Sequence, residues 1–173
     1  NFSSLVFMLP LSIGVGVTIR VGHSIGEGLP DHARVAARTG LMLGMAVAAC
    51  TAALTVLLRE QIATIYTDDM QVITLAATLL FFAAIYQVSD SVQVVAAAAL
   101  RGYKDTKAIF YVTIVAYWGL GLPTGMLLGL TDWVVPRMGP QGFWVGFIVG
   151  LTGAALMLGA RLKVIYGRFG AHP

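Results

Sequence analysis

One carboxylate lies deep within an apolar stretch of this sequence. Asp90 falls inside the run 72–100, and no other apolar run of the chain holds an ionisable residue so far from its ends. Placing a charged side chain in hydrocarbon costs about 2.5–3.5 kcal/mol on insertion scales, so such residues usually bind a ligand or pair with another group. Asp90 is therefore the first candidate for a functional residue.

Polar side chains near Asp90 add oxygen atoms to one helix face. On a helix, Tyr86, Asp90 and Gln93 share a face at positions i, i+4 and i+7. A carboxylate in this setting can hold a proton or a hard cation such as Na⁺, and hard cations prefer oxygen ligands. The pattern predicts a cation site with Asp90 at its centre, Tyr86 as a ligand and Gln93 as a weaker candidate. The alternative is that Asp90 pairs with a basic residue or with backbone and only holds the helices together.

A single carboxylate cannot complete such a site. The other apolar runs carry no Asp, Glu, Lys or Arg in their middle, so we expect a second carboxylate to come from outside this sequence. The chain also begins at Asn1, directly in apolar sequence and without Met, which is typical of a fragment. We therefore expect the N-terminal part of a longer protein to complete the site.

Composition places these residues in a membrane. Of the 173 residues 58% are apolar and 11% are charged, against about 25% charged in soluble domains. Five runs are long enough to cross a bilayer as helices, and they cover residues 1–19, 39–58, 72–100, 108–131 and 143–160. The fold class predicted is an all-α, polytopic membrane bundle of five transmembrane helices. The lone Cys50 and the lack of His in the runs argue against a metal centre or an enzyme.

Basic residues mark one side of the predicted bundle. Nine of the eleven lie in alternate connections or after the last run: Arg20, Arg34, Arg38, Arg101, Lys104, Lys107, Arg161, Lys163 and Arg168. The positive-inside rule places that side in the cytoplasm, so the N-terminus of the fragment is expected outside and its C-terminus inside. The basic excess of +3 thus indicates topology and not a nucleic-acid partner.

Glycine and proline give the local structure within the runs. Two glycine series at four-residue spacing predict helix-packing faces, one of Gly121, Gly125 and Gly129 and one of Gly142, Gly146 and Gly150. Pro10 and Pro123 each remove a backbone hydrogen bond and predict a kink. In the connections, a short surface helix with Asp31 as its N-cap is expected, and Asp68–Asp69 is expected to form a turn and an N-cap.

Several stretches together resemble the MATE family of multidrug and toxic compound extrusion antiporters, and its NorM-like branch most closely. They are RVGHSIGEG (20–28), AAIYQVSDSVQVVAAAALRGYKDT (83–106), YWGLGLPTG (117–125) and GFWVGFIVGL (142–151). The resemblance implies the last five of twelve helices, that is, most of the C-terminal six-helix lobe. It also implies that Asp90 and Tyr86 match a cation-binding Asp and Tyr of that lobe. The first lobe and helix seven, which contributes a Glu, are then missing partners.

The resemblance implies a function as well. We expect a Na⁺- or H⁺-coupled antiporter in a bacterial inner membrane that exports cationic, amphipathic drugs. No cofactor besides the coupling ion is expected. If sodium drives transport, the ion bound at Asp90 is Na⁺. The fragment is not expected to transport alone, and its substrate-binding residues are not identified. One alternative is a lipid-linked saccharide flippase, which would need basic residues in its cavity; no Lys or Arg lies within a run, which argues against it. Another alternative is a non-transporting structural membrane subunit.

Overall fold

A computed structural model describes residues 2–137 and 139–170, which fold almost wholly into helices. The elements are α1 (Phe2–Gly26), α2 (Pro30–Leu57), α3 (Arg59–Tyr66), α4 (Met70–Gly102), α5 (Thr106–Ile114), the π-helix η1 (Val115–Gly121), α6 (Leu122–Leu130) and α7 (Pro140–Gly170). Five segments are long and apolar enough to cross a membrane: α1, α2, α4, α7 and the continuous series α5–η1–α6. The prediction of an all-α bundle with five membrane helices is confirmed.

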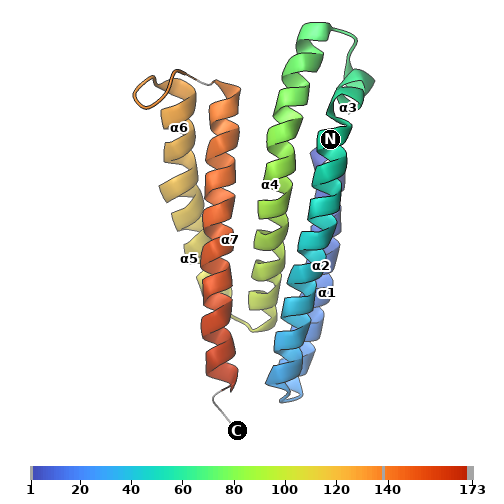
Figure 1. Cartoon of the computed structure of the whole chain (residues 1–173). Helices are drawn as coiled ribbons and strands as arrows, with labels where there is room; N and C mark the ends of the chain where they lie inside the picture. Colours follow the sequence, from blue (N-terminus) through green and yellow to red (C-terminus); the bar gives the residue numbers. More distant parts are fainter. Residues whose placement is uncertain (1, 138, 171–173) are drawn as a thin grey trace.

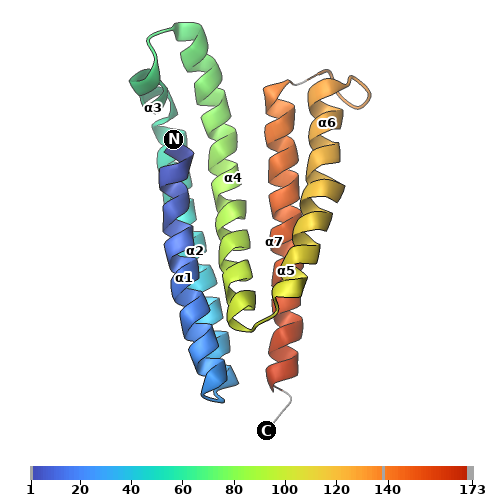
Figure 2. The ribbon, with the colours of Figure 1, turned by 180° about the vertical axis from the view of Figure 1, so that it is seen from behind.

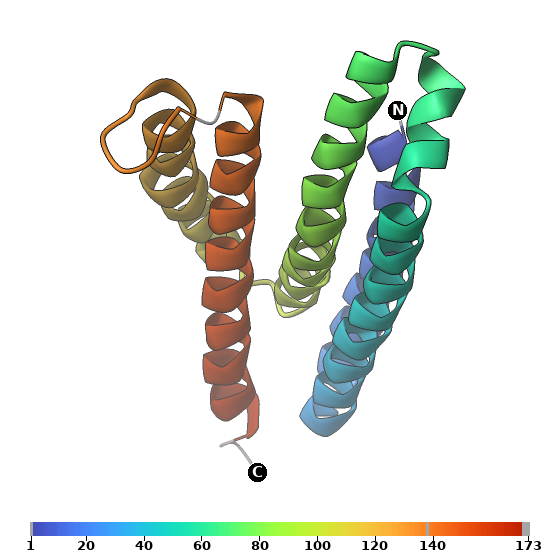
Figure 3. The same ribbon diagram turned by 45° about the horizontal axis from the view of Figure 1, so that its top comes forward.

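The five segments run up and down beside one another (Figure 1 and, from behind, Figure 2). The connections 27–29 and 103–105 and the end of α7 lie at one end of the bundle, and α3 and the segment 131–137 lie at the other. We call the end with the connections 27–29 and 103–105 the basic end. The nine basic residues used above to predict the topology belong to the helices and connections that meet there. Figure 3 shows α1, α2 and α4 as one group and α5, α6 and α7 as another.

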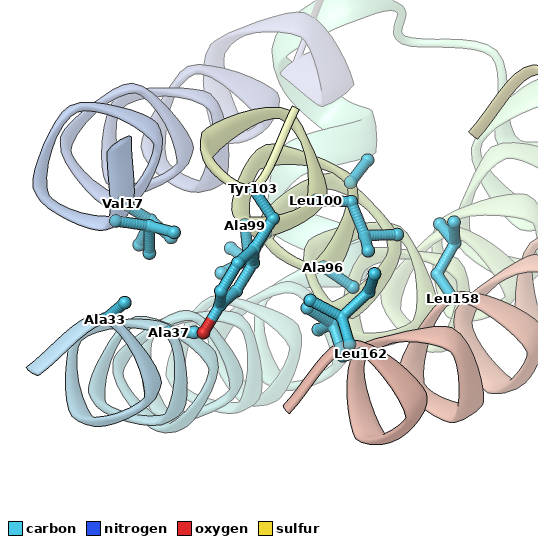
Figure 4. Packing of buried hydrophobic residues seen from close by; sticks show 13 residues of the cluster. Val17, Ala33, Ala37, Ala96, Ala99, Leu100, Tyr103, Leu158 and Leu162 are labelled. Carbon is cyan, nitrogen blue, oxygen red and sulfur yellow. The ribbon is translucent and has the colours of Figure 1, made fainter. Parts of the chain in front are cut away.

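Helix α4 joins these two groups, since it packs against α1, α2 and α7. Its half nearer the basic end is almost wholly buried, with a run of small residues from Val95 to Ala99 followed by Leu100. In Figure 4, Leu100 and Ala96 of α4 lie beside Leu158 and Leu162 of α7, and Val17, Ala33 and Ala37 approach from α1 and α2. Alanine at these positions lets the helix backbones come close together.

Small hydroxyl groups hydrogen-bond α4 to three neighbouring helices. Thr18 of α1 donates to the Ala98 carbonyl at 2.9 Å, and Ser91 donates to the Gly44 carbonyl of α2 at 2.9 Å. Ser89 and Thr152 of α7 share a hydrogen bond of 3.0 Å. Large apolar side chains point the other way, with Met42, Leu57, Trp118 and Leu156 about 70% exposed, as expected of a surface covered by lipid.

The two glycine series are helix-packing faces, as predicted, and they face each other between η1–α6 and α7. A Cβ placed on Gly146 would lie 2.6 Å from Gly125 Cα, and one on Gly142 would lie 2.5 Å from Gly129 N. A Cβ on Gly150 would lie 3.1 Å from Gly121 Cα. The antiparallel helices therefore touch backbone to backbone at these three levels.

Three local predictions were incomplete or wrong. Asp31 is not an N-cap: α2 begins at Pro30 and continues into the membrane, so the expected surface helix is its first turns. Proline is favoured there because the first helical N–H groups have no helical acceptor. Helix α1 continues past Arg20 to Gly26. The prediction for Asp69 is confirmed, since its carboxylate accepts from Gln71 N at 2.9 Å at the start of α4.

The turn before Pro123 widens into the π-helix η1. Leu122 N donates to Tyr117 O, five residues earlier, in place of the usual four. Pro123 has no N–H for the carbonyl of Gly119, so the regular α-helical hydrogen bond between these residues is missing. π-helical turns are rare and are frequently found at functional sites.

Candidate functional site

Asp90 lies in the middle of α4, one turn from the tightly packed half of that helix. Its side chain is only 8% exposed. Within the described residues the carboxylate takes part in neither of the two ion pairs and in none of the side-chain hydrogen bonds that join the helices. The structural alternative, in which Asp90 is held by a basic residue or by backbone, therefore finds no partner in this part of the chain.

Asp90 faces a cavity of about 250 Å³ between α1, α2 and α4. Its wall consists of Ser4, Val6, Phe7, Pro10, Val47, Ala48, Thr51, Tyr86, Gln87 and Asp90. The carboxylate is the one ionisable acid among these described wall residues, and no Lys or Arg is among them. The other polar groups are hydroxyls and one amide, so the cavity offers oxygen atoms and one negative charge. That is the chemistry of a site for a proton or a hard cation.

Tyr86 belongs to this cavity and also to a second one. Its ring meets Trp144 of α7 edge to face, with centroids 5.7 Å apart. The second cavity, of about 460 Å³, has aromatic walls from Tyr117 and Trp118 of η1 and from Phe143 and Phe147 of α7. Tyr86 thus lines both the cavity that contains Asp90 and an apolar, aromatic one.

Gln87 is a polar wall residue that the sequence pattern did not select. It is buried, and its Nε2 donates to Thr55 Oγ1 of α2 at 3.3 Å. Its Oε1 is buried without a hydrogen-bond partner among the described residues. A buried acceptor of this kind usually has a partner, such as a water or an ion. The sequence did contain a signal for Gln87. On a helix, the residue three positions before Asp90 lies on the same face as Asp90, just as the residue four positions before it does.

Gln93 lies on the other side of Asp90. At about 100° per residue, Gln87 and Gln93 stand about 60° to either side of the carboxylate. The cavity opens toward α1 and α2 on the Gln87 side, and Gln93 is not among its described wall residues. The structure therefore brings Tyr86 and Asp90 to one cavity and leaves Gln93 outside it.

Pro10 belongs to the same wall and leaves one backbone carbonyl of α1 without its usual helical donor. In an α-helix the N–H of residue 10 would donate to the carbonyl of Val6, and proline has no N–H. Val6 and Pro10 both line the cavity beside Asp90. In the described part of the chain, no group of three or more His, Cys, Asp or Glu residues is placed to hold a metal ion.

The sequence matches a known family over most of its length. The MatE family model covers residues 1–127, which is nearly three quarters of the chain. The chain belongs to the MatE family. The expected resemblance is therefore confirmed, and the family is one of transporters and not of enzymes.

Curated MatE relatives include two bacterial multidrug resistance proteins. The chain is 61% identical to MdtK of Pectobacterium atrosepticum over 165 residues and 64% identical to NorM of Vibrio vulnificus over 166 residues. The matches cover 95% and 96% of this chain but 36% of each relative. The chain thus spans about a third of the length of these relatives.

Solved MATE structures share the fold. The crystal structure of the eukaryotic MATE transporter AtDTX14 matches 96% of this chain and 37% of its own, with a TM-score of 0.86 at 24% identity. An inward-facing multidrug resistance MATE transporter of the MOP superfamily matches 97% of this chain and 39% of its own, with a TM-score of 0.82 at 15% identity. The five-helix arrangement is therefore that of part of a MATE transporter.

Proposed function

We propose that this chain is part of a cation-coupled multidrug antiporter, and that Asp90 binds the coupling cation. The observation that carries the proposal is Asp90, a residue only 8% exposed that lines a partly polar cavity whose described wall has no basic residue. The names of the MdtK and NorM relatives support multidrug export as the activity of the whole protein. Its cargo would be cationic, amphipathic, drug-like molecules, and its other substrate Na⁺ or H⁺.

Oxygen atoms around Asp90 would complete part of the cation site. Tyr86 supplies a hydroxyl, Gln87 an amide oxygen and Val6 a backbone carbonyl that lacks its helical donor. In other transporter folds, backbone carbonyls that lack a helical hydrogen bond help to coordinate the coupling ion. The remaining ligands would come from the part of the protein beyond this chain, so the fragment alone would not transport.

The coupling follows from exchange at one carboxylate. A cation entering from outside neutralises Asp90 and favours one arrangement of the helices, and its release on the inside favours the other. A membrane potential adds about 2.3 kcal/mol per charge per 100 mV to the difference between the two arrangements. Because Tyr86 lines both cavities, a cation beside Asp90 and an aromatic drug in the 460 Å³ cavity would compete for its position.

The basic end would face the cytoplasm of a bacterium, with the protein in the inner membrane. This proposal rests on the nine basic residues whose elements meet at one end of the bundle, combined with the positive-inside rule. A flippase for lipid-linked saccharides is the weaker alternative, because an acidic cavity repels a pyrophosphate headgroup.

The test is drug efflux from cells that express the full-length protein with Asp90→Asn. We expect efflux to fall at least tenfold, while Asp68→Asn, the same change at an exposed position outside the cavity, leaves efflux unchanged. Measuring efflux with and without Na⁺ at fixed pH identifies the coupling ion. Normal efflux and a normal cation response in Asp90→Asn would refute the proposal and favour a structural role for this carboxylate.

A further inference from the structure

A second charged cavity lies at the basic end, far along α4 from Asp90. It has a volume of about 380 Å³ and lies between the connection 103–105 and the last turns of α7. Lys104, Arg161 and Arg168 line it together with one acid, Asp105, and the rings of Tyr103 and Phe169. Three positive charges against one negative charge make it an anion site.

The one acid in the cavity is already engaged. Arg161 Nε donates to Asp105 Oδ2 at 2.6 Å, and the Asp105 side chain is only 15% exposed. This contact uses one of the five guanidinium N–H donors. The contact therefore fixes Arg161 in the wall of the cavity while its terminal nitrogens remain for another acceptor.

Lys104 occupies a backbone position that favours glycine. Its φ is +64°, the one positive φ at a non-glycine residue within the described chain. It follows the end of α4, where Lys104 N donates to Arg101 O and Asp105 N donates to Leu100 O, both at 2.9 Å. Helices commonly end with a left-handed residue at this place, and it is usually glycine. Because lysine is unusual in this backbone conformation, the ammonium group of Lys104 is a candidate for a binding role.

The position of the cavity along the spans selects the kind of anion. It lies between the end of one membrane span at Gly102, the start of the next at Thr106 and the last turns of α7, and therefore at the depth of lipid headgroups. The rings of Tyr103 and Phe169 lie against each other with centroids 5.3 Å apart and give it one apolar wall. Basic pockets between membrane helices are known sites for the headgroups of anionic lipids.

We propose that this cavity binds the phosphodiester headgroup of an anionic bilayer lipid. Lys104 and Arg168 pair with the phosphate, the Arg161 guanidinium donates hydrogen bonds to its oxygens, and the ring of Phe169 packs against the glycerol and upper acyl carbons. The bound lipid then holds α7 to the connection between α4 and α5. The inference does not depend on Asp90, so it can be tested separately from the proposed cation site.

The experiment is lipid binding to the purified full-length protein, measured by native mass spectrometry with phosphatidylglycerol and with phosphatidylcholine. The cavity variant combines Lys104→Gly, which suits the positive φ, with Arg168→Gln. Its matched control combines Lys107→Gln with Lys163→Gln, the same charge change on exposed residues of the same end outside the cavity. At about 1 kcal/mol for each basic residue, we expect the cavity variant to bind phosphatidylglycerol about thirtyfold more weakly.

The control and the Asp90→Asn protein should retain their affinity for phosphatidylglycerol within about twofold, and phosphatidylcholine should bind weakly to all forms. Equal loss in the cavity variant and the control would overturn the proposal in favour of diffuse attraction to the membrane. Equal binding of the two lipids by the unmodified protein would overturn it too. Displacement of the lipid by millimolar inorganic phosphate would show a site for free anions instead.

Discussion

At the scale of single residues, Asp90 has a glutamine on either side of it along α4, and only Gln87 lines its cavity. A carboxylate inside an apolar run is visible without a structure, because its cost in a membrane marks it out. The choice between Gln87 and Gln93 depended on which side of α4 faces the cavity, and helix periodicity leaves both within about 60° of Asp90. Only the packing of α1 and α2 against α4 decides for Gln87.

The first prediction separates these two glutamines. Gln87→Leu removes the buried Oε1, so the full-length protein should need about three to ten times more coupling cation for half-maximal efflux. Thr55 keeps its own hydrogen bond to Thr51 O at 2.8 Å, so the fold should survive. Gln93→Leu is the matched control and should leave the cation response unchanged. A larger effect of Gln93→Leu than of Gln87→Leu would return Gln93 to the site.

Pro10 gives the second prediction. Pro10→Ala restores an N–H donor for the carbonyl of Val6 and removes a helix-breaking residue, so α1 should become more stable. The same hydrogen bond takes the carbonyl away from a cation, and the affinity for the coupling cation should fall about threefold or more. Cation titration of efflux and thermal unfolding of the same protein measure the two effects. An unchanged cation affinity would remove the Val6 carbonyl from the proposed site.

At the scale of elements, patterns that repeat along a helix were predictable and single turns were not. The glycine series predicted two helix-packing faces because four-residue spacing puts the residues on one side of a helix, and the structure shows that these faces meet each other. The π-helix η1 was not predicted, although Pro123 was recognised as a disruption. A proline in the sequence shows that one hydrogen bond is lost, but it does not show whether the helix kinks or widens. The structure has a π-helix at this place.

The third prediction concerns this contact. Gly146→Ala places a methyl group 2.6 Å from Gly125 Cα and forces α6 and α7 apart, which should destabilise the protein by about 1–3 kcal/mol. Gly159→Ala, on the same helix, meets nothing within 4 Å and should be neutral or slightly stabilising. The midpoints of thermal unfolding in detergent compare the two. Equal midpoints would show that the helices do not touch at Gly146.

At the scale of the whole molecule, the two helix groups are tied together at the basic end. Arg34 of α2 donates to the Tyr166 carbonyl of α7 at 3.1 Å and lies over the Tyr166 ring, 5.3 Å from its centre. Burial and the nearby Tyr166 raise the pKa of Tyr103 to about 12 despite Arg34, so its hydroxyl is neutral in a cell.

The membrane architecture follows from the sequence at this scale, and the complete site does not. The length and apolarity of the runs and the alternation of basic connections predicted five spans. Each span is a helix because in lipid the backbone N–H and C=O groups must form hydrogen bonds within the segment itself. The chain covers about a third of the relatives' length. Under the proposed function, the ligands that complete a cation site around Asp90 would come from the rest of the protein, so this sequence alone does not identify them.

The most direct measurement is cation-driven drug exchange by the full-length protein reconstituted in liposomes. A Na⁺ or H⁺ gradient across the membrane should drive drug movement in the unmodified protein. We predict that Asp90→Asn abolishes this response while the protein still folds and inserts, and that Asp90→Glu, which keeps the carboxylate, retains part of it. Gradient-driven exchange by Asp90→Asn at the unmodified rate would contradict the claim that this carboxylate carries the coupling cation.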